Sequence, residues 1–351
     1  YQPHSGQSSC LDADAGYYVD TTAATSQTAC TTGTYQPSTG QSSCIDASPG
    51  HYVSTPAATQ QSECQLGTYQ PDYGRTYCYE ASPGHYVDSI ASSNQTACLA
   101  GSYNPDSGST SSSACVLASA GYFVAFYGSE NQTACYPGTY QPSTGGYGCI
   151  EASQGHYVPN NASVQQFECP IGTYQPYYGR TSCIDASAGH YVDQPAAVNQ
   201  TACSAGTYNP SEGSHSPDDC LDAESGYYTD VNGSYNQREC TPGTYQPESG
   251  QISCLDAEPG YFVNSYASIS QIPCGKGTYQ PNASTDFCHS ADAGHYVDTE
   301  GAMSQTACLP GTYNPNSGST TSDNCIDTNP GYLTDSSAMN FQIPCQPGTF
   351  Q

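Results

Sequence analysis

The chain has no tryptophan, only two methionines and only four basic residues among its 351 amino acids. The basic residues stand against 31 acidic ones, so the formal net charge is −27. Such a surface repels phosphate backbones and anionic lipid headgroups. We therefore expect no nucleic-acid partner, whereas divalent cations would be attracted and a long chain would stay soluble.

Long apolar runs and helical patterns are also missing. No stretch approaches the 18 apolar residues of a membrane span, and we expect no membrane insertion. Proline and glycine interrupt the chain about every ten residues, which disfavours helix beyond single turns. The sequence has no initiating methionine or signal peptide, and both Tyr1-Gln2-Pro3 and Phe350-Gln351 fall at one point of a repeat. We therefore expect a window from a longer chain.

Cysteine, in contrast, is abundant and regularly spaced. The 20 cysteines follow a repeating series of sequence offsets, 20, 14, 20, 14, 20 and 17, from Cys10 to Cys345. The spacing predicts ten tandem units of 34, 34 and 37 residues, grouped into superunits of 105 residues. These superunits cover approximately residues 10–114, 115–219 and 220–324, and residues 325–351 start a fourth.

Each unit is too small to bury a hydrophobic core of its own. Domains below roughly 40 residues depend on disulfides, metals or neighbouring units for stability. Plentiful and regular cysteine in such units is typical of oxidised, extracytoplasmic proteins. We therefore expect cystine-stapled units that stack on one another in an extracellular or cell-surface protein.

Each unit also contains two similar halves. Both halves carry a Gly-x-Tyr signature, as in Gly33-Thr34-Tyr35 and Gly50-His51-Tyr52. Glycine allows a turn with positive φ, and the residues after it favour a short extended segment. The predicted fold class is small disulfide-rich tandem repeats with short β-strands and loops, little helix, and an elongated rod or solenoid shape.

The 105-residue period extends beyond the cysteines. Each long interval opens with Tyr-Asn-Pro, at Asn104, Asn209 and Asn314, where the short intervals have Tyr-Gln-Pro. Recent duplication in blocks of three units would give this pattern without structural meaning. Alternatively, every third unit meets an equivalent environment, as in a superhelix or a filament lattice.

The first half of the unit carries a recognisable motif. Cys-x-x-Gly-Thr-Tyr followed by a second cysteine at the short spacing, as in Cys30 to Cys44, resembles the cysteine-rich repeats of the ephrin-receptor-like type. It is also similar to the simplest module of tumour necrosis factor receptors. The resemblance covers the whole chain through two cysteines, one glycine and one aromatic residue per unit.

In that family each half of the unit has its own bridge, but here the second half has lost both cysteines. One lost position is occupied by Ala13, Ala47, Ala81, Ala118, Ala152, Ala186, Ala223, Ala257, Ala291 and Thr328. The other is always glutamine: Gln27, Gln61, Gln95, Gln132, Gln166, Gln200, Gln237, Gln271, Gln305 and Gln342.

The resemblance therefore implies that the remaining cysteines close the first half. The implied pairs are Cys30 with Cys44, Cys64 with Cys78, Cys98 with Cys115, Cys135 with Cys149, Cys169 with Cys183, Cys203 with Cys220, Cys240 with Cys254, Cys274 with Cys288, and Cys308 with Cys325. Cys10 and Cys345 would then pair outside the window. The competing phase begins with Cys10 bonded to Cys30 and pairs all 20 cysteines internally.

The recurring glutamine has two interpretations. It replaces the lost bridge by hydrogen-bonding the backbone of the adjacent unit while the alanine fills the space left by sulfur, or it is merely exposed. A closed loop of this size contributes about 3 kcal/mol in the chain-entropy model, so the loss of a bridge needs compensation.

No group of residues predicts catalysis or a cofactor, and we expect no enzyme. Five histidines occupy one repeat position, which holds tyrosine in the other units: His51, His85, His156, His190 and His295. This exchange favours a stacking or loop-edge role over zinc binding. Asp12 and Asp14 are candidate calcium ligands, but no bidentate glutamate completes a calcium-binding loop.

Six Asn-x-Ser/Thr sequons predict N-linked glycans in the expected compartment. They are at Asn94, Asn131, Asn161, Asn199, Asn232 and Asn282. The 32 tyrosines predict stacking along the array, with a carbohydrate-binding strip as an alternative role.

Taken as a whole, the sequence predicts the shaft or subunit of a glycosylated extracellular filament, stalk or sheath. Its partners would be copies of itself or other surface proteins, and its only attached groups would be glycans. The alternative is the stalk or ligand-binding ectodomain of an adhesin or receptor. Near-identity of the ten units favours the structural role, since a receptor site usually sets one or two units apart.

Overall fold

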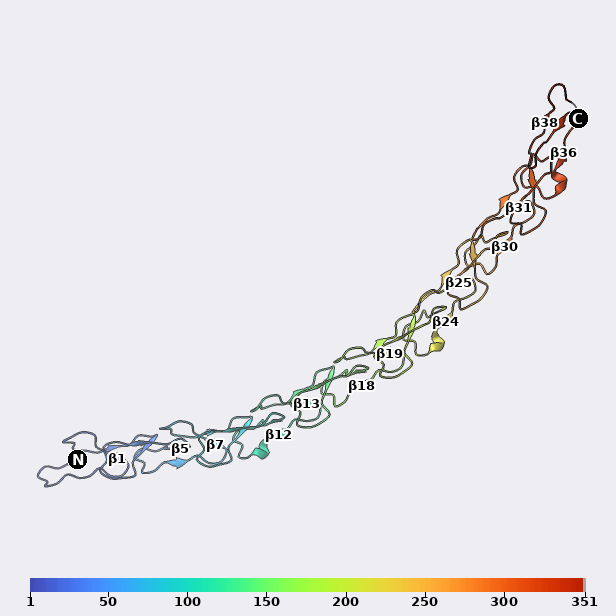
Figure 1. The fold of residues 1–351 in the computed structure, drawn as a ribbon. Helices are drawn as coiled ribbons and strands as arrows, with labels where there is room; N and C mark the ends of the chain where they lie inside the picture. The colour runs from blue at the N-terminus through green and yellow to red at the C-terminus, as the bar shows by residue number, and fades with distance from the viewer. Residues whose placement is uncertain (350–351) are drawn as a thin grey trace. The chain divides into compact units, whose positions relative to one another are not determined.

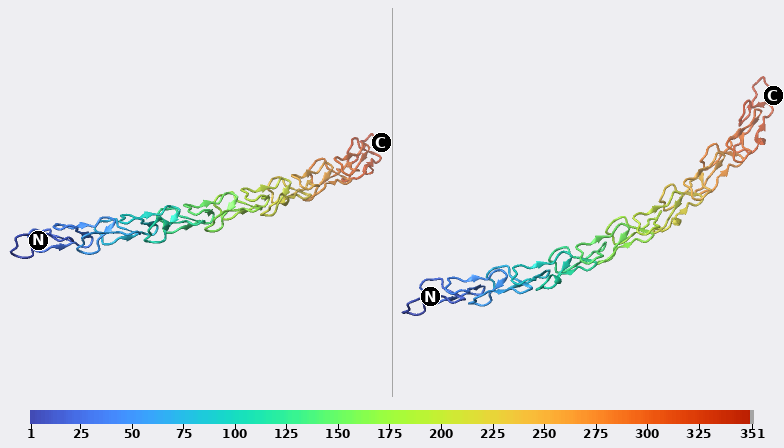
Figure 2. Two further views of the ribbon diagram at one scale, coloured as in Figure 1. Left: turned by 90° about the horizontal axis from the view of Figure 1, so that it is seen from below. Right: turned by 60° about the horizontal axis from the view of Figure 1, so that its bottom comes forward.

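The computed structural model describes residues 1–349. The chain divides into two compact units, one comprising Tyr1–Glu168 and Tyr177–Ser182, the other comprising Cys169–Pro176 and the chain from Cys183 onward. Within each unit, short antiparallel hairpins follow one another in sequence order (Figures 1 and 2). The predicted fold class is confirmed: the described residues form disulfide-bonded repeats of paired two-residue strands, with almost no helix and no closed barrel.

The elementary repeat is half of a cysteine-defined unit, and two kinds of half alternate. We call the half that contains the bridge the disulfide half, as at residues 30–46, and the half that follows it the glutamine half, as at residues 47–63. Each half contributes one hairpin, whose second strand begins directly after the second cysteine or its glutamine counterpart.

The hairpins of the disulfide halves pair a strand that ends in tyrosine with the strand after the second cysteine. They are β3 (Thr34–Tyr35) with β4 (Ile45–Asp46), β7 (Thr68–Tyr69) with β8 (Tyr79–Glu80), β11 (Ser102–Tyr103) with β12 (Val116–Leu117), β15 (Thr139–Tyr140) with β16 (Ile150–Glu151), β19 (Thr173–Tyr174) with β20 (Ile184–Asp185), β23 (Thr207–Tyr208) with β24 (Leu221–Asp222), β27 (Thr244–Tyr245) with β28 (Leu255–Asp256), β31 (Thr278–Tyr279) with β32 (His289–Ser290), and β35 (Thr312–Tyr313) with β36 (Ile326–Asp327).

The hairpins of the glutamine halves have the same register. They are β1 (Tyr17–Tyr18) with β2 (Thr28–Ala29), β5 (His51–Tyr52) with β6 (Ser62–Glu63), β9 (His85–Tyr86) with β10 (Thr96–Ala97), β13 (Tyr122–Phe123) with β14 (Thr133–Ala134), β17 (His156–Tyr157) with β18 (Phe167–Glu168), β21 (His190–Tyr191) with β22 (Thr201–Ala202), β25 (Tyr227–Tyr228) with β26 (Arg238–Glu239), β29 (Tyr261–Phe262) with β30 (Ile272–Pro273), β33 (His295–Tyr296) with β34 (Thr306–Ala307), and β37 (Tyr332–Leu333) with β38 (Ile343–Pro344).

A tight turn precedes the first strand of each hairpin. In the turn at residues 31–34, the N–H of Thr34 donates to the carbonyl oxygen of Thr31 at 3.1 Å, and Gly33 at the third position has φ +88°. That conformation belongs to a type II turn, which favours glycine at its third position and proline before it. Several turns carry the Pro-Gly pair that this geometry favours, as at Pro49-Gly50.

Backbone hydrogen bonds tie each half to the next within each compact unit. The N–H of Gly16 donates to the Gln36 carbonyl oxygen at 2.8 Å, and the N–H of Val19 donates to that of Gln41 at 3.0 Å. In the opposite direction, the N–H of Gly40 donates to the Ala13 carbonyl oxygen at 2.8 Å. Equivalent bonds recur from half to half, so each hairpin is anchored by its neighbour as well as by its own pairing.

Within each compact unit the core is built from small side chains. The first cysteine of each bridge and the corresponding alanine of the glutamine half are buried together with valines such as Val53, Val158 and Val263. The turn glycines complete this packing, because a Cβ on Gly50 would lie 2.0 Å from the carbonyl oxygen of Ala91. A side chain larger than hydrogen therefore does not fit where one half meets another.

The long intervals differ from the short ones by a single turn of 3₁₀ helix. These turns are η1 (Ser112–Ala114), η2 (Pro217–Asp219) and η3 (Ser322–Asn324), and each ends directly before the second cysteine of its bridge. The three extra residues are thus absorbed in the loop between the two paired strands, and the strand register is the same as in the short intervals.

Candidate functional site

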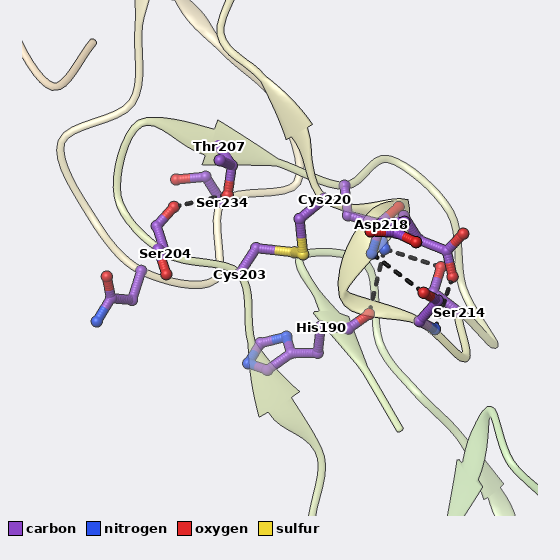
Figure 3. The surroundings of a disulfide bond; sticks show 12 residues. His190, Cys203, Ser204, Thr207, Ser214, Asp218, Cys220 and Ser234 are labelled. Carbon is purple, nitrogen blue, oxygen red and sulfur yellow. Dashed lines mark hydrogen bonds between the residues drawn. A yellow bond between two sulfur atoms is a disulfide. The ribbon is translucent and has the colours of Figure 1, made fainter. Parts of the chain in front are cut away.

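Nine disulfides close the disulfide halves, with Cα–Cα distances of 5.6–5.8 Å. The bonds join the nine pairs of the phase that the family resemblance implied, and the described chain leaves Cys10 and Cys345 unbonded. Each hairpin brings its two cysteines together because one precedes the turn and the other precedes the returning strand. Figure 3 shows the bond between Cys203 and Cys220.

All ten recurring glutamines close the glutamine halves. In each half, the glutamine Oε1 accepts a hydrogen bond from the backbone N–H 13 residues earlier, which is the residue directly after the buried alanine or, in the last unit, after Thr328. For Gln61 and Ser48 the distance is 2.8 Å. We call this contact the glutamine clasp.

The glutamine clasp closes the half beside the two chain positions that a second bridge would join. Ala47 and Gln61 occupy the positions in the glutamine half that Cys30 and Cys44 occupy in the disulfide half, and Ala47 is fully buried. The expectation that glutamine would bond the adjacent unit was therefore wrong. Its partner lies in the same half, because the hairpin brings the first and last residues of the loop in that half side by side.

Several clasps have a second hydrogen bond when the partner residue is polar. The Gln27 Nε2 donates to a carboxylate oxygen of Asp14 at 2.6 Å, and the Gln305 Nε2 donates to Asp292 at 2.6 Å. The candidate calcium ligand Asp14 is thus already engaged by an amide. The described residues contain no group of three or more His, Cys, Asp or Glu side chains that is able to hold a metal ion.

A buried asparagine distinguishes every long interval. The Asn209 side chain is 1% exposed, and its Nδ2 donates to the His190 carbonyl oxygen at 3.2 Å and to the Ser214 Oγ at 2.8 Å. Its Oδ1 accepts from the N–H of Ser211 at 3.0 Å. Figure 3 labels His190 and Ser214 near the Cys203–Cys220 bond.

The corresponding glutamines of the short intervals bind differently. The Gln246 Nε2 donates to the Ser253 carbonyl oxygen, seven residues later, at 2.8 Å. Asn104 and Asn314 repeat the contacts of Asn209 with His85 and His295. The Tyr-Asn-Pro signature therefore marks a buried polar link between halves, which the sequence argument noticed as a period but did not assign to a contact.

The helix η2 is capped by its own last residue. The N–H groups of His215 and Ser216 donate to the Asp219 carboxylate at 2.9 and 3.0 Å. These backbone hydrogen bonds lower the pKa of Asp219 below its ordinary value of 3.8, and the nearby His215 lowers it further. The cap stabilises the turn that accommodates the three extra residues of the long interval.

Histidine occupies the edge of a loop, one of the two roles predicted for it. The Nδ1 atoms of His51, His85, His156 and His190 lie 3.0–3.3 Å from the carbonyl oxygen two residues earlier. Each histidine begins the first strand of a glutamine half, directly after the turn glycine. This contact fixes each of these four rings against its own turn.

The aromatic contacts are local. Tyr69 and Tyr79, which are cross-strand partners in β7 and β8, have ring centroids 6.0 Å apart, and Tyr77 meets Tyr79 edge to face at 5.2 Å. The hydrogen bond with Tyr77, together with its charge, raises the pKa of the Tyr79 hydroxyl. These ring pairs lie within single halves, and the stacking of tyrosines along the array stays a prediction.

All six sequon asparagines are exposed: Asn94, Asn131, Asn161, Asn199, Asn232 and Asn282. Asn94, Asn131 and Asn199 lie just before the second strand of a glutamine half, with the clasp glutamine as the middle residue of the sequon. The Asn232 Oδ1 accepts a hydrogen bond from the Ala205 N–H at 2.8 Å, which leaves its Nδ2 without a competing acceptor among the described contacts. Attachment of glycans stays a prediction.

No helix in the described part of the chain is both long and apolar enough to cross a membrane. The family model described as tyrosine-protein kinase ephrin type A/B receptor-like matches residues 16–64 and 155–203. The predicted resemblance is confirmed. Each matched stretch runs from a turn glycine through the rest of one glutamine half, a whole disulfide half and the next glutamine half to the first cysteine of the following bridge.

No curated protein matches the chain. The matched module is of the receptor-ectodomain type, which is not a catalytic module. Together with the nine disulfides, the match indicates an extracellular, ectodomain-like repeat array.

Proposed function

We propose that this chain is an extracellular structural protein, the shaft or a subunit of a glycosylated filament, stalk or sheath. The observation that supports this function is the uniformity of the links between halves. The same set of backbone hydrogen bonds and the same two kinds of closure recur throughout each compact unit. A repeat of this kind sets length and spacing, because adding a unit extends the array without altering the others.

The exposed sequons support the glycosylated part of the proposal. Secretion of the chain from eukaryotic cells is expected to yield a mass that falls after treatment with an N-glycosidase. Peptide mass spectrometry then reports which of the six asparagines are converted to aspartate. An unchanged mass from glycosylation-competent cells would remove the glycan from the proposal.

We propose that the partner of this chain is a second copy of itself. The net charge determines the salt concentration at which the copies associate. Copies with a net charge of −27 repel each other at long range, and salt screens this repulsion over about 10 Å at 0.1 M ionic strength. We therefore expect lateral association to strengthen as ionic strength rises, which analytical ultracentrifugation at several salt concentrations measures directly.

A second function, the stalk or ligand-binding ectodomain of an adhesin or receptor, is favoured by the match to the ephrin-receptor-like family. Negative-stain electron microscopy of the purified glycoprotein separates the two. Ordered fibres at moderate ionic strength support the structural function. Discrete single molecules at every salt concentration would overturn the filament and favour the ectodomain.

A further inference from the structure

The two kinds of half are closed by bonds of very different strength. A disulfide half is closed by a covalent bond across 14 or 17 residues, as between Cys169 and Cys183 or between Cys203 and Cys220. A glutamine half is closed at the same positions by the hydrogen bond between a glutamine and a backbone N–H, as for Gln200 and Ser187 at 2.7 Å. The two closures alternate along the chain.

Apart from this closure, the halves are held alike. In a disulfide half the N–H of Gly206 donates to the Thr229 carbonyl oxygen at 2.9 Å, and in a glutamine half the N–H of Gly189 donates to that of Asn209 at 2.7 Å. The hairpins have equal strand lengths and the same register. When the ends of the chain are pulled, the closure is therefore the feature that makes the halves respond differently.

The covalent bonds also determine which residues can transmit tension. Between Cys183 and Cys203 lie 20 residue steps that only non-covalent contacts keep folded. Between Cys169 and Cys183 the tension passes through the sulfur atoms, and the 14 enclosed steps carry none. The same division recurs in every unit whose bridge is formed.

We propose that the array is a tether of limited extension, in which the glutamine halves open under load while the disulfide halves stay closed. Each unit then yields its 20 unbridged steps, and extension stops when the bridges come under tension. The bridged loops stay closed on either side of each opened segment, although full extension also unpairs the strand that follows the second cysteine, as β20 follows Cys183. They present the backbone groups on which the glutamine half re-forms when the load falls.

The length of this extension follows from chain geometry. Twenty fully extended steps span about 72 Å, whereas the bridge itself spans 5.6–5.8 Å. For the whole chain with nine bridges intact, the fully extended length is about 830 Å, against about 1,260 Å when every bridge is reduced. The oxidised molecule should therefore stop at roughly two thirds of the reduced length.

The inference rests on the proposed structural function, since only a load-bearing chain would use it, but the two fail in different experiments. Discrete molecules in electron micrographs would contradict the proposed filament, but the extension limit could still be measured on those single molecules. Force curves that contradict the limit would overturn the proposed tether, but they would not affect the proposal that the chain forms fibres.

The test is single-molecule force spectroscopy on the full chain held by its ends, first oxidised and then in a phosphine reductant. The expected result is a low-force extension of the oxidised chain to about 830 Å, and a further gain of about 430 Å after reduction. An oxidised chain that detaches from its handles without lengthening would overturn the proposal, and so would one that reaches the reduced length.

A matched variant tests the glutamine half itself. Ala186→Cys with Gln200→Cys places two cysteines at the positions that correspond to Cys169 and Cys183, and peptide mapping establishes whether they bond. With the extra bridge the oxidised limit should fall by about 45 Å, whereas the Ala186→Ser, Gln200→Ser control should keep the original limit. An unchanged limit despite a mapped tenth bridge would contradict the proposal. If no bridge forms in the variant, the extended lengths of the oxidised and reduced wild-type chain still test the proposal.

Discussion

The side chain of Gln200 closes its half by accepting a hydrogen bond of 2.7 Å from the backbone N–H of Ser187. This contact stands where a disulfide closes the neighbouring halves, and it recurs at all ten equivalent glutamines. A hydrogen bond thus alternates with a covalent bond at one structural position along the array.

Replacement of Gln200 by alanine should weaken its half by about 1 kcal/mol, because a net intramolecular hydrogen bond contributes about 0.5–1.5 kcal/mol. Hydrogen–deuterium exchange of peptides covering residues 187–202 should show faster exchange of the Ser187 amide and of β21 and β22. The control is Gln194→Ala, which removes an exposed glutamine of the same half. Equal exchange in the two variants would mean that the clasp contributes nothing.

Asn209 should be far less tolerant of change than an exposed asparagine. Asn209→Ala leaves the His190 carbonyl oxygen and the Ser214 hydroxyl without their buried donor and should cost about 1–3 kcal/mol. Urea unfolding of the oxidised chain and exchange at residues 190 and 211–214 measure the loss, with Asn236→Ala as the exposed control.

Asn209→Gln tests why the long intervals use asparagine. It restores the Tyr-Gln-Pro sequence of the short intervals, but the three inserted residues displace the carbonyl group that glutamine binds there. We expect it to resemble the alanine variant in stability. Wild-type stability with glutamine would show that the choice of residue is not structural.

The turn glycines should reject even a methyl group. In Gly189→Ala the new Cβ would lie 2.1 Å from the Gly233 carbonyl oxygen, and φ at this position is +85°. The left-handed conformation alone costs about 1–2 kcal/mol, and the clash adds to it. Urea unfolding should show a loss of about 2 kcal/mol or more, whereas Gly148→Ala, with open space around its Cβ, should change stability by less than about 0.5 kcal/mol.

The cap of η2 should make the long interval sensitive to acid. Because the pKa of Asp219 is lowered in the folded chain, its stabilisation is present above the ordinary pKa of 3.8 and is lost as pH falls through the lower folded value. The protection of the His215 and Ser216 amides, expressed relative to the intrinsic exchange rate at each pH from 5 to 2, should fall at the acid end. Asp219→Asn should abolish this pH dependence, and Asp218→Asn should retain it.

Peptide mapping of the oxidised protein should recover Cys30 linked to Cys44 and Cys203 linked to Cys220. Digestion under acidic conditions, which suppress disulfide exchange, keeps the native pairs. Recovery of Cys44 linked to Cys64 would contradict both the structure and the pairing that the resemblance implied.

The sequence predicted the repeat, the glycine turns, the short strands and the scarcity of helix, because each depends on local preferences or spacing. The partner of Gln61 was beyond that reasoning. The sequence offered a partner in the adjacent unit or exposure to solvent, and the partner in the same half depends on how the hairpin folds back. Likewise, Asn209 was visible as part of a period, but its contacts with His190 and Ser214 depend on where three inserted residues go, and spacing alone does not fix that path.

The backbone hydrogen bonds between halves join residues at fixed sequence offsets. In the short intervals, Gly16 bonds to Gln36, Val19 to Gln41, and Gly40 to Ala13. Removal of 34 consecutive residues therefore brings equivalent partners back to the same offsets and leaves the remaining cysteines in phase. Loss of a single residue shifts one hairpin against both neighbours. Recombination between the coding repeats can thus shorten or lengthen the gene product by whole units without an intermediate that fails to fold.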